Sequence, residues 1–249
     1  MDTRCERTLD SLRARHIHGI FAENSEKARL KILNLIPKKA VVGIGDSTAV
    51  RQLGIPGLLK ERGTKLLDAF ERLGPDIDPK DIQERRGGIL KDATVSDVFL
   101  TGTNAITEDG RLVNVDAVGN RVAGMFWGHH MSVIAVGRNK IVRDLNEAFD
   151  RIRNIISPNH IHIRTAELGG RKLKTPCVAT GKCNDCRTPD RACNIFTIIE
   201  GKPWRTDLNV VIVNEDLGLG WDPSWPQERI MKILENYKNF VWIPPRNDH

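Results

Sequence analysis

The chain has 249 residues, of which 40% are apolar and 28% are charged, enough for one large domain with a sizeable core. No apolar run approaches the roughly 18 residues of a membrane span, and the N-terminus lacks the apolar segment of a secretory signal. We therefore expect a cytoplasmic protein without a membrane partner. The net charge of +6 comes from scattered basic residues, aromatic residues make up only 5%, and no RNA-binding signature occurs. This composition predicts no nucleic-acid partner and favours an anionic small molecule.

Helices and strands are expected to alternate along the chain. Helical periodicity at residues 4–22 and 25–36, before Pro37, predicts a helical opening at residues 1–37. We expect strands at residues 40–45, 64–70, 96–106 (running into a loop), 131–137 and 208–214. We expect helices at residues 56–62, 78–96 (broken near Gly87 and Gly88), 118–128, 144–156 and 226–237. Residues 108–116 predict a hairpin with an Asp-Gly turn.

This alternation predicts a single α/β domain over residues 1–249, with a mostly parallel sheet covered by helices on both faces. Two further segments accompany the fold. Residues 175–194 form a cysteine-rich loop, and residues 221–249 form a C-terminal extension that carries one helix.

The turn after the first predicted strand is a candidate anion site. Gly45 is followed by Asp46, Ser47 and Thr48, and then by the expected start of a helix. Backbone N–H groups and hydroxyl donors at a helix N-terminus suit an anionic ligand. The same residues also suit a tight turn with a hydroxyl cap, so the sequence leaves both interpretations open.

A second group of polar residues lies between residues 101 and 121, at a strand end, a hairpin and a helix start. A carboxylate beside hydroxyl and amide groups is what proton transfer next to a carbonyl requires. Turn formation alone would also explain the asparagines. The candidate catalytic residues are Asn104, Glu108 and Asp116. The candidate ligand-binding residues are Thr103, Asn120 and Arg121, of which the arginine suits a substrate carboxylate.

Histidines occur in two close pairs. His129 and His130 are adjacent, so on a strand they would point to opposite faces, and at most one would enter a given pocket. We retain His129 as a candidate acid–base residue. His160 and His162 lack a third ligand nearby, and we interpret them as packing or surface residues.

Four of the five cysteines lie in residues 175–194, with the spacing C-x5-C-x2-C-x6-C. They are Cys177, Cys183, Cys186 and Cys193. In a reducing compartment such a group indicates a bound metal rather than disulfides. Structural zinc sites usually combine two close cysteine pairs, and only one is present. The spacing therefore favours a [4Fe–4S] cluster, with zinc and metal-free redox thiols as alternatives.

Several long motifs resemble the LUD (lactate-utilisation) domain family. They include VFLTGTNAITEDGRLVNVDAVGNRVAGMFWG and SVIAVGRNKIVRDLNEAFDRIRNIISPNH. The cysteine segment and VIVNEDLGLGWDPSWP resemble the cysteine-bearing branch of that family. The resemblance covers most of residues 25–235. One departure is Trp127-Gly128-His129-His130, where the family usually has aliphatic-Gly-Pro-Lys.

The resemblance implies a fold similar to the sugar-phosphate isomerase and CoA-transferase superfamily, in which a GxGST-type turn holds an anionic substrate. Residues 43–48 are similar to that turn. It also implies a role in the oxidation of lactate or related acids, often beside iron–sulfur partner proteins. We therefore expect an iron–sulfur enzyme that acts on an anionic small organic acid, its cluster transferring electrons or activating the substrate.

Two alternatives stay open. One is a non-catalytic electron-transfer or scaffold subunit of an organic-acid oxidation complex. The other is an enzyme like the isomerases or CoA-transferases, with a structural zinc. A redox partner protein and a homodimer are compatible with the main hypothesis.

Overall fold

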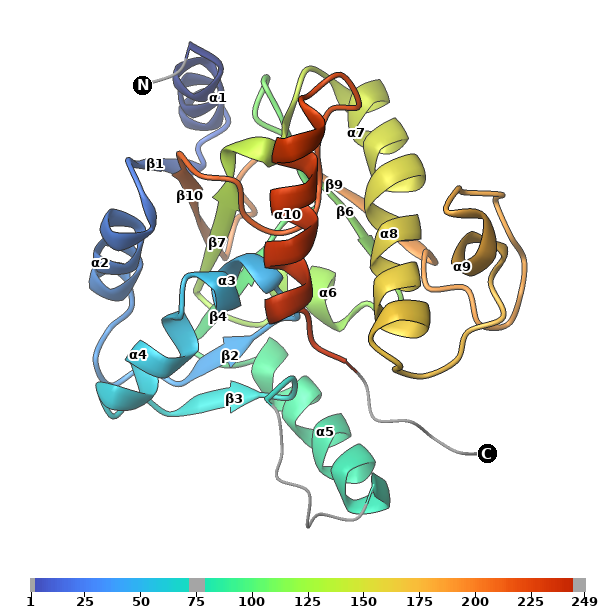
Figure 1. Cartoon of the computed structure of the whole chain (residues 1–249). Helices are drawn as coiled ribbons and strands as arrows, with labels where there is room; N and C mark the ends of the chain where they lie inside the picture. The colour runs from blue at the N-terminus through green and yellow to red at the C-terminus, as the bar shows by residue number, and fades with distance from the viewer. Residues whose placement is uncertain (1–2, 72–78, 244–249) are drawn as a thin grey trace.

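A computed structural model describes residues 3–71 and 79–243, with only the backbone described at residues 79–83. Within these residues, six strands form a central sheet in which every neighbouring pair runs parallel (Figure 1). Their spatial order is β1 (His18–Ala22), β10 (Asp207–Val213), β7 (Met131–Gly137), β4 (Val98–Gly102), β2 (Val42–Ile44) and β3 (Leu66–Asp68). The apolar runs at the centre are buried, as a parallel sheet requires. The predicted α/β class is confirmed.

A smaller sheet packs beside the central one. Its strands are β8 (Ile141–Val142), β5 (Ala105–Thr107), β6 (Leu112–Asp116) and β9 (Ile195–Ile199). Strands β5 and β6 form the predicted antiparallel hairpin, with Gly110 in its turn at a φ of 86°. Strand β9, which follows the cysteine loop, pairs antiparallel with β6. This pairing brings the end of the cysteine loop to the start of helix α6.

Helices cover both sheets. In the described part of the chain they are α1 (Thr3–Ala14), α2 (Ser25–Leu35), α3 (Thr48–Gln52), α4 (Ile55–Glu61), α5 (Pro79–Thr94), α6 (Asn120–Phe126), α7 (Leu145–Arg151), α8 (Ser157–His162), α9 (Pro176–Thr180) and α10 (Gln227–Phe240). Helices α2, α3 and α4 bury one face of the central sheet. Helices α1 and α6 and the second sheet bury the other face. The outer face of the second sheet packs against α7 and α10 (Figure 1).

Residues 145–167, between β8 and the cysteine loop, form one continuous run of helical turns, which we call the helical column. Helix α7 continues through a π-helical turn at Ile152–Ile156, then α8, then a second π-helical turn at Ile163–Glu167. A π-turn widens a helix and lets it continue past Pro158, whose ring nitrogen cannot donate a hydrogen bond. The predicted helix at residues 144–156 therefore extends further than the sequence indicated.

Three expectations about the elements were wrong. The helix expected at residues 4–22 ends at Ala14, and the chain turns at His16, with a φ of 59°, into the edge strand β1. Helix α5 runs unbroken through Gly87 and Gly88, because an exposed helical glycine costs only about 1 kcal/mol. The strand expected at residues 96–106 is divided into β4 and β5. Residues 1–2, 78 and 244–249 of the predicted segments lie outside the described residues.

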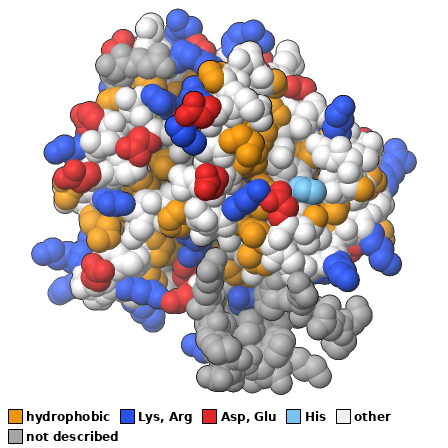
Figure 2. All heavy atoms as spheres, viewed as in Figure 1, with side chains coloured by type: hydrophobic (Ala, Val, Ile, Leu, Met, Phe, Trp, Pro, Cys, Tyr) orange, Lys and Arg blue, Asp and Glu red, His pale blue; other side chains and the backbone are white. Residues whose placement is uncertain are grey.

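Charged side chains are mixed on the face shown in Figure 2. Basic and acidic groups alternate there, with apolar side chains between them. The excess of basic residues is therefore not gathered into one patch on this face. Among the described residues, no helix has the length and apolar character needed to cross a membrane.

Candidate functional site

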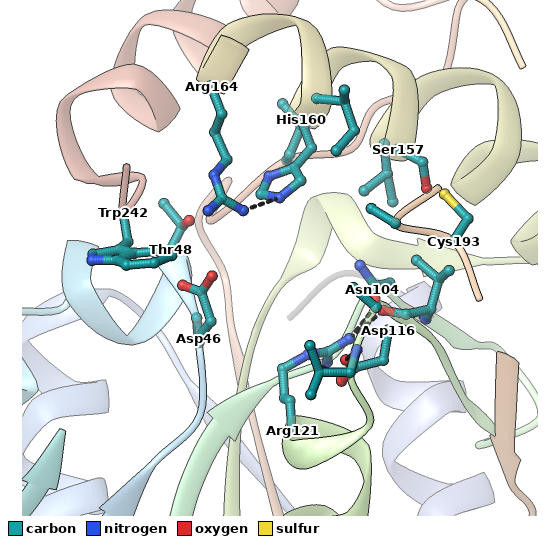
Figure 3. Close-up of a pocket in the computed structure, with 18 of the residues that line it drawn as sticks. Asp46, Thr48, Asn104, Asp116, Arg121, Ser157, His160, Arg164, Cys193 and Trp242 are labelled. Atoms are coloured by element: carbon teal, nitrogen blue, oxygen red, sulfur yellow. Dashed lines mark hydrogen bonds and ion pairs between the residues drawn. The ribbon is translucent and has the colours of Figure 1, made fainter. Parts of the chain in front are cut away.

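A cavity of about 560 Å³ lies at the carboxyl ends of the parallel strands. The segments that follow β2, β4, β7 and β10 supply residues to its wall, as do α6, α8 and α10. Ligands of open α/β sheets bind at this edge. The predicted residues that line the cavity are Asp46, Ser47, Thr48, Thr103, Asn104, Asp116, Asn120, Arg121 and Cys193. Two separately predicted groups thus meet in one site (Figure 3). They are the glycine turn at residues 45–48 and the polar residues between 101 and 121.

Arg121 lines the cavity and donates hydrogen bonds to four oxygen atoms of the protein. Its Nη1 donates to the Asn114 side-chain oxygen at 2.9 Å and to the Gly102 carbonyl at 3.2 Å. Its Nη2 donates to the Asn104 side-chain oxygen at 2.8 Å and to the Val115 carbonyl at 2.7 Å. These four bonds use the forked end of the guanidinium. Arg121 therefore holds Asn104 in place rather than offering the free fork predicted for a substrate carboxylate.

Asp116 is also engaged by the protein. One carboxylate oxygen accepts from the backbone N–H groups of Val118 and Gly119, and the other accepts from Val122. The second oxygen also lies 3.7 Å from Arg121 Nε. These contacts fix the start of α6, where the N-terminal N–H groups need acceptors. The carboxylate lines the cavity but acts first as an anchor for this helix.

The turn at residues 45–48 provides both the helix cap and the cavity-lining side chains that the sequence left open as alternatives. Ser47 accepts a hydrogen bond from the N–H of Val50 at 3.3 Å and so caps α3. Thr48 and Asp46 line the cavity. Gly45 lies below the cavity wall, where an added Cβ would come within 2.7 Å of Thr101 Oγ1. The turn therefore places its side chains, and not Gly45 itself, against a ligand.

Asp46 is a partly buried carboxyl group that faces Arg164 across the cavity (Figure 3). Burial raises its pKa, and this effect outweighs the opposing influence of Arg164, Arg51 and Arg121. A carboxyl group with a raised pKa holds its proton more readily and can donate it to a bound oxygen atom. Asp46 is therefore the group in the cavity best suited to act as a general acid.

A chain of hydrogen bonds connects α8 to α10 at the top of the cavity. Arg164 Nη1 donates to His160 Nε2 at 2.9 Å, and His160 Nδ1 pairs with the Tyr237 hydroxyl. Because Nε2 accepts, the proton of the neutral imidazole lies on Nδ1 and is donated to Tyr237. Burial and the nearby Arg164 lower the pKa of His160 well below its ordinary value. The histidine is therefore a neutral group that positions Arg164.

Arg164 has donors to spare. Within the described residues its side chain hydrogen-bonds to His160, no ion pair joins it to a carboxylate within 4.0 Å, and its Nε has no partner. The guanidinium carbon lies 5.1 Å from the centre of the Trp242 ring. An arginine oriented by a histidine and an aromatic ring, with unused donors at a cavity, suits a carboxylate ligand. Arg164, rather than Arg121, is the candidate anion-binding arginine.

The four loop cysteines line a second, smaller cavity of about 30 Å³. The two cavities share Ser157, Ile161, Arg191, Ala192 and Cys193 in their walls. Arg191 orders this part of the loop, because its Nε donates to the Cys193 carbonyl at 3.0 Å and its Nη1 donates to the Cys186 carbonyl. Burial raises the pKa of the Cys193 thiol. Cys193 is thus the loop thiol that also faces the large cavity.

The four thiols of the small cavity are the ligand type that an iron–sulfur cluster requires. Four thiols converge from one loop, and thiolates are the usual ligands of the irons, which are spread over several ångströms. In residues 3–71 and 79–243, no group of three or more His, Cys, Asp or Glu side chains is placed closely enough to hold a metal ion. The cysteines are also free of disulfides.

The comparisons with known proteins agree with the motifs quoted above. The LUD domain family model matches residues 5–213. The chain belongs to the LUD domain family. Among solved structures, the chain is similar to a DUF162 family protein from Deinococcus radiodurans, with 15% identity, a TM-score of 0.43, and coverage of 86% of this chain and 99% of that one. No curated protein matches this LUD protein.

Two predicted catalytic residues of the LUD protein lie outside the large cavity. Glu108 lies at the far end of the β5–β6 hairpin and forms ion pairs with Arg4 at 2.8 Å and Arg7 at 2.6 Å. His129 precedes β7, at the amino edge of the sheet, where its Nε2 lies 2.6 Å from Ser132 Oγ. Both positions follow from the direction of the strands. The two ends of a strand lie at opposite edges of its sheet, and each of these residues lies at the end away from the cavity. The contacts give both residues structural roles.

The sequence did not reveal four polar residues of the LUD cavity. Arg164 and His160 come from the helical column, Tyr237 comes from α10, and Lys140 follows β7. His160 was interpreted as a packing or surface residue, whereas it positions a cavity arginine. Its spacing of four residues from Arg164 was the available signal, since residues four apart share one helix face.

Replacing Asp46 with Asn is expected to raise the free energy of unfolding near neutral pH. Between the ordinary pKa of 3.8 and the raised folded value, the folded protein binds more protons than the unfolded chain. Wild-type stability therefore falls as the pH rises through this window, and an amide avoids that loss. Urea unfolding at about pH 3 and about pH 7 should show a gain for Asp46→Asn at the higher pH only. An equal gain at both pH values would contradict this account.

Proposed function

We propose that this LUD protein is an iron–sulfur enzyme that acts on an anionic small organic acid in the large cavity. The observation that carries the proposal is the shared wall between the two cavities, in which Cys193 faces both. A cluster held by Cys177, Cys183, Cys186 and Cys193 would therefore lie directly beside the bound acid. Family membership supports this proposal because the LUD domain is named for lactate utilisation.

The cavity offers complementary groups to each part of a 2-hydroxy or 2-oxo acid. Arg164 has donors for the carboxylate. The amide nitrogen of Asn104 points into the cavity, away from Arg121, and can donate to the second oxygen (Figure 3). Asp46 supplies or takes up the proton on that oxygen.

Oxidation of a 2-hydroxy acid to a 2-oxo acid releases two electrons and two protons. A [4Fe–4S] cluster, if bound, would pass these two electrons one at a time to a redox partner protein, which has to accept both of them for each acid oxidised. The protein's own part is to hold the carboxylate at Arg164 and to accept the hydroxyl proton. The four cysteines would place the electron acceptor at the wall that the substrate touches.

The composition and ligand binding of anaerobically purified protein test the proposal. We expect about four iron and four sulfide per chain and broad absorption near ~400 nm. Lactate or pyruvate should bind, and Arg164→Met should weaken that binding by about 10- to 100-fold, since a charge-assisted pair contributes roughly 1.5–3 kcal/mol. The control is Arg143→Met, which removes an exposed arginine paired with Asp144.

Two results would overturn the proposal. Stoichiometric zinc without iron would show that the cysteines hold a structural metal and not a redox cluster. Equal affinities in Arg164→Met and Arg143→Met would show that the carboxylate binds elsewhere.

A further inference from the structure

Lys140 is a buried amine that the binding of an organic acid does not by itself explain. It ends the short 3-10 helix Arg138–Lys140, which directly follows β7 at the carboxyl edge of the central sheet. Its side chain is buried, with 8% of the residue exposed, and it lines the large cavity with Asp46 and Arg121. A lysine at this depth needs a reason, because burial of an ammonium group is costly.

The surroundings of the amine do not stabilise a positive charge. Its Nζ donates to the Thr103 carbonyl at 2.8 Å, and within the described residues no carboxylate forms an ion pair with it. Gly218 packs against it so closely that an added Cβ would lie 2.8 Å from Nζ. The charged group that acts on it is another cation, Arg121. Burial and this neighbour lower the pKa of Lys140 to about 7.

The wall of the large cavity combines a buried amine, a carboxyl group and an arginine with unused donors, from Lys140, Asp46 and Arg164. We propose that Lys140 forms an imine with the carbonyl carbon of a 2-oxo acid bound there. This inference rests on the proposed function, because Arg164 has to hold the carboxylate of the acid.

The step balances with the residues present. The Lys140 nitrogen forms a bond to the carbonyl carbon, and one amine proton and the proton of Asp46 pass to the carbonyl oxygen, which leaves as water. The products are a protonated imine on Lys140, an ionised Asp46 and one water molecule. Desolvated lysines are well suited to such covalent chemistry, because only the neutral amine is a nucleophile.

Reductive trapping tests the imine directly. The full-length, cluster-containing protein is incubated with pyruvate and sodium cyanoborohydride, and intact mass and peptide mapping locate the adduct. We expect one adduct per chain, at Lys140, and none in Lys140→Met. The matched control is Lys202→Met, which removes a surface lysine paired with Asp207 at 3.0 Å and should trap as the wild type does.

The pH dependence gives a second readout. Trapping should rise with pH around 7, the pKa of Lys140, for as long as Asp46 keeps its proton. An ordinary lysine would react on the order of a thousandfold more slowly at that pH, because so little of it is neutral. Asp46→Asn should slow adduct formation by roughly 100-fold, since it removes the proton donor.

Calorimetry without the reductant separates the possible failures. Binding of pyruvate and lactate without any adduct at Lys140 would overturn the imine and leave the proposed function intact. Adducts spread over surface lysines in the wild type would also overturn it, and this result does not depend on whether Lys140→Met folds. Absence of binding for both acids would overturn the proposed function and the imine together.

Discussion

Replacing Cys186 with Ser is expected to remove most of the iron and sulfide from the protein. The four loop thiols line one small cavity, and in the proposed site they are the complete set of cluster ligands, so loss of one would break that set. We expect the same result for each of the other three loop cysteines, with cluster content at least about tenfold below wild type. Iron and sulfide analysis after anaerobic purification measures the effect.

Cys5→Ala is the matched control, because Cys5 lies fully buried in α1 and packs in the core between the two sheets. It removes a thiol without touching residues 175–194, and its iron content should equal that of the wild type. Retention of the cluster in Cys193→Ser alone would contradict the four-ligand set. It would show instead that Cys193, the thiol that faces the large cavity, is free for the substrate.

The fold should survive loss of the proposed cluster. The loop cysteines are only partly buried, and the loop lies beside α8, outside the three buried cores (Figure 1). Urea unfolding of Cys186→Ser should therefore resemble that of the wild type, while proteolysis within residues 175–194 should become faster. Insoluble protein would instead indicate a structural metal that the fold requires.

Much of the fold could be predicted because its central strands are buried on both faces. Residues 131–137 and 208–214 are mostly apolar, and both segments form strands of the parallel sheet. Edge strands carry a weaker signal. Strand β1 was mistaken for a helix because its residues are only partly buried, so its apolar positions fit either period.

The candidate site could be predicted where its residues are close in the chain. The cysteine loop and the glycine turn each lie within one short segment, so their spacing was visible in the sequence. Arg164 and Tyr237 meet Asp46 only because the helical column and α10 fold over the same edge. The sequence could not show that Arg121 is already engaged by the protein. Its four acceptors are brought together only by folding, so the spacing of residues does not reveal how many donors remain for a ligand.

Replacing Arg121 with Met is expected to lower the free energy of unfolding by about 3–5 kcal/mol. The change removes a charged donor from the side-chain oxygens of Asn104 and Asn114 and from two carbonyl oxygens. Asn104 then keeps only the Val115 N–H as a donor to its side-chain oxygen, and Asn114 keeps Thr103 and the Asn104 N–H. It also leaves the Asp116 carboxylate, which is 8% exposed, without its cation. Arg121→Lys keeps the charge but cannot reproduce the forked geometry, so it should lie between wild type and Arg121→Met.

The comparison with Arg164→Met separates support of the site from contact with the substrate. Arg164 makes few contacts with the protein, so its loss should weaken pyruvate binding with little effect on urea unfolding. Arg121→Met should reduce both stability and binding, because Asn104 loses its anchor. Loss of binding in Arg121→Met at full wild-type stability would reverse this assignment. It would mean that Arg121 itself holds the substrate carboxylate, as the sequence first suggested.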